Sequence, residues 1–151
     1  MRGQHQGSEE RTRLGGLPSG GALALALALA AACGGPAEYA VVGSPRATAT
    51  DGILQLEEAE GGERLLTLVL DRLPPPADIA EGMTTYVAWL DPTEGEPTKL
   101  GALEYDAAAE RGRLMATTAL PAFTLRVTAE ASAEVERPSD LLVARRRVAE
   151  D

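Results

Sequence analysis

The segment Phe123-Thr-Leu-Arg-Val-Thr-Ala-Glu130 decides the fold class of this chain. Apolar and polar side chains alternate strictly along it: one set is Phe123, Leu125, Val127 and Ala129, and the other is Thr124, Arg126, Thr128 and Glu130. Successive side chains of a β-strand point to opposite faces, so a period of two indicates a strand. We expect the apolar set to face a core and the polar set to face water.

Strand patterns continue on both sides of this segment. In residues 64–71, alternation puts Leu66, Leu68 and Leu70 on one face and the mixed set Leu65, Thr67, Val69 and Asp71 on the other. The strand is expected to end before Pro74-Pro75-Pro76, whose nitrogens cannot donate to a ladder. Residues 85–90 are apolar on both faces, which predicts a central strand with Trp89 in the core. Further short strands are predicted at 47–50, 53–57, 100–106, 113–118 and 141–147, and single helical turns at 77–82 and 107–111. We therefore predict an all-β fold, an immunoglobulin-like antiparallel β-sandwich of about seven to eight strands.

An export signal is predicted ahead of this domain. Residues 22–32 are eleven uninterrupted apolar residues, whereas a membrane-spanning helix needs about 20. Arg2, Arg11 and Arg13 precede the run, which matches a basic region followed by the apolar region of a signal peptide. We expect residues 1–32 to be the signal peptide, residues 33–44 a flexible tether, and residues 45–151 the β-domain.

The end of the apolar run resembles the bacterial lipobox. Small side chains at 30–32 stand directly before Cys33, although the lipobox prefers Leu where this chain has Ala30. The resemblance implies that Cys33 is a lipid attachment site, becomes the new N-terminus, and anchors the protein to a membrane facing the periplasm or exterior. Gly34 replaces the aspartate that retains some lipoproteins at the inner membrane, which favours the outer membrane.

Two other interpretations of this segment stay open. Residues 30–32 also satisfy the A-x-A rule for ordinary secretory cleavage, which would release a soluble protein with a free thiol. The apolar run would otherwise be an alanine-rich helix buried in the folded domain, but loop residues flank it where helix caps are expected.

Composition restricts the function of the mature chain. Residues 1–32 carry three arginines and two glutamates, so the remaining 11 basic and 21 acidic residues give a formal charge of −10. Such a surface repels nucleic acid. The only histidine is His5 and the only cysteine is Cys33, which leaves no imidazole or free thiolate for transition-metal binding or nucleophilic catalysis. We therefore predict a protein that is not an enzyme and takes no cofactor.

Two acidic clusters are the candidates for a cation site. They are Glu57, Glu58, Glu60 and Glu63 in one segment, and Asp91, Glu94 and Glu96 in the other. Calcium takes six to eight converging oxygens, and neither cluster has EF-hand spacing. Paired carboxylates also hydrolyse glycosides, but few aromatic residues remain to stack on sugars. We interpret both clusters as solvated turns and predict no metal site.

The run Arg145-Arg146-Arg147 stands out in an acidic chain. It would suit a phosphate or a carboxylate partner. A solvated terminal strand whose charges discourage edge pairing is the interpretation that we favour, because Glu150 and Asp151 follow at once.

Four segments, in their order and spacing, resemble the extracytoplasmic domain of anti-sigma-K-type anti-sigma factors. They are Tyr86-Val-Ala-Trp-Leu90, Lys99-Leu-Gly-Ala-Leu103, Phe123-Thr-Leu-Arg-Val-Thr-Ala-Glu130 and Pro138-Ser-Asp-Leu-Leu-Val143. The resemblance covers roughly residues 66–148 and implies a small β-sandwich outside the membrane. Those regulators also have a sigma-binding domain and a spanning helix, for which we expect no room here, so sigma inhibition is not carried over.

These observations together predict a non-catalytic lipoprotein of the bacterial envelope. We expect it to be held at the membrane through Cys33 and to contact an envelope protein or support an envelope assembly. The alternatives are a small-ligand or cation-binding module of the envelope and a secreted soluble β-sandwich protein.

Overall fold

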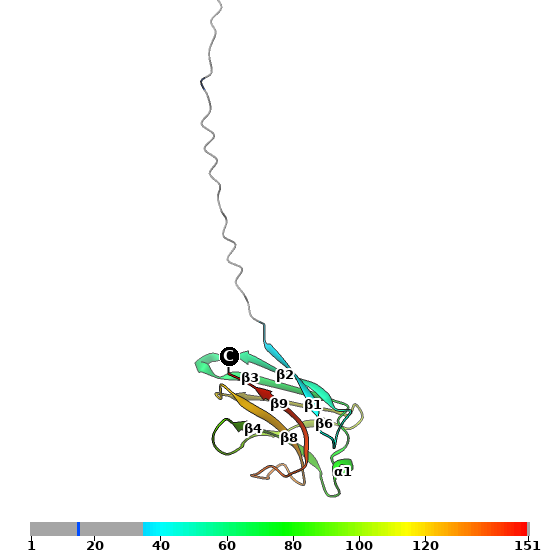
Figure 1. Cartoon of the computed structure of the whole chain (residues 1–151). Coiled ribbons are helices and arrows are strands. Elements are labelled where there is room, and N and C mark those ends of the chain that lie inside the picture. Colours follow the sequence, from blue (N-terminus) through cyan, green and yellow to red (C-terminus); the bar gives the residue numbers. More distant parts are fainter. Residues whose placement is uncertain (1–14, 16–34, 151) are drawn as a thin grey trace, which may run out of the picture. The chain divides into compact units, whose positions relative to one another are not determined.

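Nine antiparallel strands form one hydrogen-bonded sheet in the computed structural model, which describes residue 15 and residues 35–150 (Figure 1). The strands are β1 Ala37–Gly43, β2 Asp51–Glu58, β3 Arg64–Asp71, β4 Thr85–Pro92, β5 Thr98–Ala102, β6 Glu104–Asp106, β7 Arg111–Thr118, β8 Phe123–Glu130 and β9 Leu142–Val148. A 3-10 turn, η1 Glu60–Gly62, and a one-turn helix, α1 Pro76–Ile79, interrupt them. The predicted signal peptide, except Gly15, and Cys33 lie outside the described residues.

The sheet curls into a nearly closed barrel. Its strand order is β5-β4-β8-β9-β1-β2-β3-β7-β6, and β5 also contacts β7, so the two ends of the sheet approach each other. Every strand pair is antiparallel, which confirms the all-β antiparallel prediction. The hydrogen bonding does not divide into two sheets, because β1 pairs with β2 along one edge and with β9 along the other.

The core lies inside this curled sheet. The decisive strand, β8, has the predicted bounds, and its apolar side chains Phe123, Leu125, Val127 and Ala129 are all buried in the central cluster. The prediction for its polar face is wrong at two positions: Thr128 is 0 % exposed and Glu130 is 4 % exposed. The segment 131–141, which connects β8 to β9, covers this part of the outer face, since its Ser139 N–H donates to Glu130 Oε1. A period of two cannot foresee this cover.

Trp89 is fully buried, as predicted, but it lies on the outer face of β4. Its neighbours along the strand, Ala88 and Leu90, belong to the central cluster, whereas Trp89 does not. Lys99 Nζ donates hydrogen bonds to the carbonyl oxygens of Ala133 and Val135 and so holds the covering segment near this face. A small second core therefore lies outside the sheet.

The expected tether is wrong for residues 37–43, which form β1. Val41 is buried and Tyr39 packs against the core, so these apolar side chains hold the segment in the sheet. The predicted strand at 47–50 is also wrong: this segment is a turn in which Gly43 N–H donates to Thr50 O at 2.9 Å.

Two other predicted elements differ in detail. Residues 100–106 divide into β5 and β6, because the N–H of Leu103 between them donates to Tyr86 O at 2.8 Å. Residues 107–110 form a turn capped by the Asp106 carboxylate, which accepts hydrogen bonds from two backbone N–H groups. The helical turn predicted at 77–82 lies close to α1. Within residues 35–150 no helix is long and apolar enough to cross a membrane.

Candidate functional site

The two acidic clusters lie at the ends of strands and in the turns that follow them. Glu57 and Glu58 end β2, and Glu60 and Glu63 continue around the turn to β3. Glu94 and Glu96 are exposed in the turn between β4 and β5. In the described part of the chain no three Asp, Glu, Cys or His side chains come together in a geometry that could hold a metal ion.

Asp91, the first residue of the second cluster, has a separate role. Its Oδ2 accepts hydrogen bonds from Arg126 at 2.9 Å from Nε and 2.5 Å from Nη2, which joins β4 to β8. Its Oδ1 is buried and has no hydrogen-bond partner in the described residues. The acidic cluster expected from the sequence is therefore divided between an ion pair and a solvated turn.

Strand β9, which carries the run Arg145-Arg146-Arg147, is an interior strand. It lies between β8 and β1, so the interpretation of these charges as protection of a sheet edge is wrong as stated. Alternation along β9 exposes Arg145 and Arg147 and turns Arg146 inward. The Arg146 guanidinium carbon lies 5.4 Å from the centroid of the Tyr39 ring, a cation–π distance.

The exposed arginines of β9 adjoin a third arginine on β8. Arg145 stands directly opposite Arg126, and Arg147 stands opposite Thr124. Like charges directly opposite each other on adjacent strands repel. Asp91 neutralises Arg126, whereas no carboxylate lies within ion-pair distance of Arg145 or Arg147 in the described residues. We call Arg126, Arg145 and Arg147 the arginine face.

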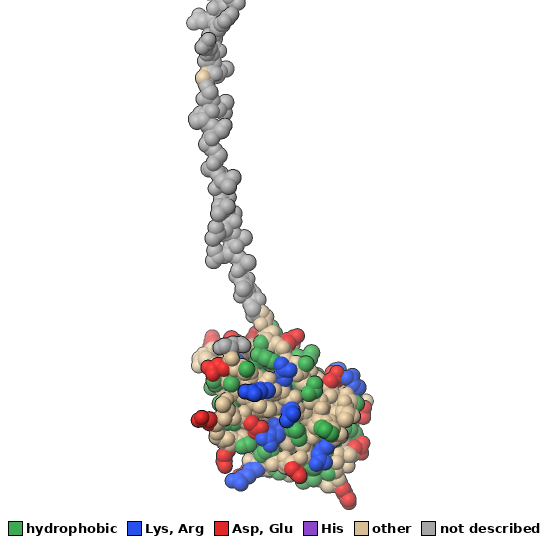
Figure 2. All heavy atoms as spheres, viewed as in Figure 1, with side chains coloured by type: hydrophobic (Ala, Val, Ile, Leu, Met, Phe, Trp, Pro, Cys, Tyr) green, Lys and Arg blue, Asp and Glu red, His purple; other side chains and the backbone are tan. Residues whose placement is uncertain are grey.

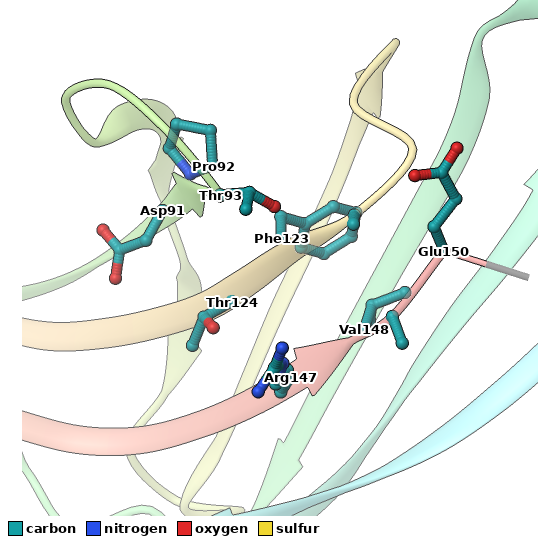
Figure 3. A pocket seen from close by; sticks show the side chains of 10 residues that line it. Asp91, Pro92, Thr93, Phe123, Thr124, Arg147, Val148 and Glu150 are labelled. Carbon is teal, nitrogen blue, oxygen red and sulfur yellow. The ribbon is translucent and has the colours of Figure 1, made fainter.

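Three shallow hollows meet at this face, and Thr124 lines all of them. One, of about 460 Å³, is lined by Asp91, Phe123 and Arg147 from three neighbouring strands (Figure 3). The second, of about 370 Å³, lies between β1 and β9, and the third, of about 240 Å³, lies beside Arg126. Figure 2 shows Lys and Arg side chains gathered in the middle of the view in which Figure 1 places β8 and β9, with most acidic side chains toward the rim.

Exposed apolar side chains continue this surface onto β1 and β2. Val42 is 61 % exposed and is the direct neighbour of Arg145 across the β1–β9 pair. Ile53 on β2 is 46 % exposed and stands between Ala40 and Val69 in adjacent strands. The outer surface therefore places arginine side chains next to exposed aliphatic side chains.

The buried polar groups beneath the segment 131–141 are fully engaged with one another. Trp89 Nε1 donates to Thr128 Oγ1 at 2.9 Å, and the Thr128 hydroxyl donates to Glu130 Oε1 at 2.5 Å. The same carboxylate oxygen accepts the backbone N–H of Ser139 at 2.7 Å. This chain of hydrogen bonds fixes the covering segment to the sheet.

The pKa values of two tyrosines, Tyr86 and Tyr105, are raised in the fold. Burial raises the pKa of Tyr86 far above its ordinary value, and the neighbouring Tyr105 and Asp78 add to the shift. Burial also raises the pKa of Tyr105. The Tyr86 hydroxyl donates to Pro74 O and the Tyr105 hydroxyl to Leu73 O, the latter at 2.7 Å. Both hydroxyls hold the proline-rich turn against β4 and β6.

Comparison with known proteins adds no relative: no protein-family model, curated protein or solved structure matches this chain. The candidate site therefore rests on the geometry of the arginine face and its hollows alone. Sequence reasoning identified Arg145 and Arg147 but missed Arg126 as their neighbour. The signal was present, since Arg126 belongs to the polar set of the decisive segment, but pairing of β8 with β9 was needed to use it.

Proposed function

We propose that this chain is a non-catalytic, lipid-anchored protein of the bacterial envelope whose β-domain makes contact with another protein. The observation that carries the proposal is the composition of its outer surface. Arg145 and Arg147 lack ion-pair partners in the described residues and lie beside the exposed aliphatic side chain of Val42. Arginine and apolar side chains together are typical of protein interfaces.

The anchor in this proposal is Cys33. Its support is the sequence alone: an apolar run too short to span a bilayer, small residues at 30–32, and the single cysteine of the chain. Two acyl chains together give stable attachment to a membrane where one does not. The domain would then work at the membrane surface facing the periplasm or exterior, at the outer membrane by the sorting rule that Gly34 satisfies.

The absence of catalysis in this proposal is supported by side-chain chemistry. Residues 35–150 contain no histidine and no cysteine, so a nucleophile activated by imidazole and a thiolate nucleophile are not available there. The hollows at the arginine face are shallow, and charged and polar side chains line them together with apolar ones. Such surfaces differ from the deep, mostly apolar pockets that bind small molecules.

The finer description of the fold also belongs to this proposal. We propose that the curled sheet is an immunoglobulin-like sandwich in flattened form, similar to the extracytoplasmic domain of anti-sigma-K-type anti-sigma factors. In support, the four segments that carry the resemblance fall on β4, on β5 with Leu103, on β8 and at the start of β9. These strands are consecutive neighbours in the order β5-β4-β8-β9.

Crosslinking in intact bacteria tests the proposal. A membrane-impermeant lysine crosslinker followed by mass spectrometry should join the chain, through Lys99, to a protein of the envelope. Cys33→Ala, expressed at the same level, should lose both the membrane fraction and the crosslinks. Crosslinks only to cytoplasmic proteins, or an unchanged membrane fraction for Cys33→Ala, would contradict the proposal.

A further inference from the structure

We infer that the seam between β1 and β9 is the binding site for an extended, acidic segment of a partner protein, which pairs with the free edge of β9 at Arg147. The inference rests on the proposed function, because it names the surface and the partner chemistry of that contact. Three observations support it. The ladder between β1 and β9 ends early, Arg145 and Arg147 have no ion-pair partner in the described residues, and a hollow lies at the same place.

Of all pairs of long strands in the sheet, β1 and β9 have the fewest paired residues. Their ladder contains only the pairs Val42–Arg145 and Gly43–Ala144, whereas β1 and β2 pair over the whole range 37–42. Beyond Val42 and Arg145 the two strands continue without pairing. Each strand therefore has a stretch of edge with no paired residue on the other strand.

The registers show which backbone groups lie on this edge. In an antiparallel ladder every second residue directs its N–H and C=O toward a given neighbour. The Ser44 N–H donates to Val143 O at 2.8 Å, so Val143, Arg145 and Arg147 direct these groups toward β1. The Gly43–Thr50 bond shows that Gly43 and Val41 face β2, which leaves Ala40 facing β9. Arg147 and Ala40 have no ladder partner across the seam among the described residues.

The seam is also hollowed and positively charged. A hollow of about 370 Å³ is lined by Ala40, Val42, Thr124, Arg145, Arg146 and Arg147. Arg146 lies at its base over Tyr39, and its Nε is buried without a hydrogen-bond partner in the described part of the chain. Three guanidinium groups in a chain of formal charge −9 attract carboxylates selectively.

These features fit an extended peptide that adds to a sheet edge. Main-chain hydrogen bonds supply affinity in this mode, and alternate side chains supply specificity. A glutamate placed opposite Arg147 would exchange both backbone hydrogen bonds with it and present its carboxylate on the face that carries Arg145 and Arg147. The next residue would turn toward Tyr39, so an apolar side chain suits that position.

Peptide binding tests the inference with a defined probe. The probe is the acetylated, fluorescently labelled amide Glu-Val-Glu-Val-Glu-Val, measured by anisotropy with the full chain in uncharged detergent micelles. We expect saturable binding and protection of the Arg147 amide from hydrogen exchange. Arg145→Glu with Arg147→Glu should weaken binding by about tenfold. The matched control, Arg113→Glu with Arg137→Glu, changes the same charge at exposed arginines elsewhere and should leave binding unchanged.

Backbone methylation separates strand pairing from simple charge attraction. N-methylation at the glutamates removes the N–H groups that face β9 and should abolish binding, whereas N-methylation at the valines should preserve it. Equal binding of both methylated peptides, binding of the Lys-Val-Lys-Val-Lys-Val counterpart, or an unprotected Arg147 amide would overturn the inference. So would binding of vesicles rich in anionic lipid that depends on Arg145 and Arg147 while the peptide does not bind.

Photocrosslinking in cells distinguishes failure of the inference from failure of the proposed function. A photoreactive residue is placed at Val42, which lines the seam, or at Met115 on β7, and the two native side chains are 61 % and 62 % exposed. Crosslinking to an envelope protein from position 42 alone, competed by the acidic peptide, is the expected result. Crosslinking from position 115 alone would overturn the inference and keep the proposed function, and none from either position would contradict both.

Discussion

Trp89, Thr128 and Glu130 are joined by hydrogen bonds between buried side chains. Thr128 accepts a hydrogen bond from the Trp89 indole and donates one to the Glu130 carboxylate, and all three residues are buried. A buried polar group that loses its partner retains the cost of its lost hydration. The hydroxyl of Thr128 is therefore the group on which the cover of the outer face depends.

Thr128→Val tests this role. Removing the hydroxyl leaves the indole N–H and a carboxylate oxygen short of a partner, so we expect a loss of about 1 to 3 kcal/mol in the free energy of unfolding. Urea denaturation followed by the fluorescence of Trp89, the single tryptophan, measures it. Thr124→Val, on the same face of β8 but half-buried and without such bonds, should change stability by less than about 0.5 kcal/mol. Equal stability of the two variants would show that the network contributes nothing.

Tyr86 predicts how stability changes at alkaline pH. Its pKa in the folded state is raised above the ordinary 10.0, mainly by burial, so the unfolded chain releases the phenolic proton first. The contribution of the protonated Tyr86 side chain to the free energy of unfolding is therefore complete below about pH 10 and is lost as the pH rises above that value. Tyr86→Phe should be less stable by about 1 kcal/mol at neutral pH, because the bond to Pro74 O is lost, and should show a smaller loss above pH 10.

Urea denaturation at several pH values between neutral pH and pH 11 measures the free energy of unfolding. The wild type, Tyr86→Phe and Tyr105→Phe are compared in this way. Tyr105 shifts in the same direction, so its variant should also flatten the profile. An alkaline loss of stability that is the same in the wild type and in Tyr86→Phe would contradict this account.

Sequence alternation predicted which strand residues face the central core but could not predict what lies on the other side of the sheet. The apolar positions of β8 were correct because they depend only on strand periodicity. The buried state of Thr128 and Glu130 depends on where the segment 131–141 travels, and that path leaves no local pattern. Cys33, the predicted lipid attachment site, stays a prediction because it lies outside the described residues.

Among the strands, the close contact of β2 with β3 depends on Gly52. A Cβ at this position would lie 2.1 Å from Val69 O, a backbone atom that cannot move without breaking the ladder. The bounds of β3 and β8 were predictable from alternation, whereas β1 was not, because the Gly, Pro and Ser residues around it suggest a tether. Only pairing with β2 and the burial of Val41 explain why residues 37–43 form a strand.

Gly52→Ala should therefore destabilise the fold. We expect a loss of at least about 1 to 3 kcal/mol, the usual cost of overpacking, since the alanine methyl group must displace β3. Gly35→Ala is the matched control, because a Cβ there has nothing within 4 Å. Thermal unfolding followed by circular dichroism compares the two, and a Gly52→Ala variant as stable as Gly35→Ala would show that β2 and β3 are further apart than described.

For the protein as a whole, we propose that a folded β-domain is held at a membrane through Cys33. The domain was predictable as all-β from its alternating segments, but its continuous nine-stranded sheet was not, because strand order depends on pairings between distant segments such as β1 with β9. The arginine face arises in the same way, since it combines residues 126 and 145, which are adjacent only in the folded protein.

Mass spectrometry of the protein purified from bacterial membranes tests the attachment at Cys33. We expect the first 32 residues to be absent and the N-terminal peptide to begin at Cys33 with a diacylglycerol on its sulfur. A protein that begins at Met1, or one that begins at an unmodified Cys33, would contradict the account.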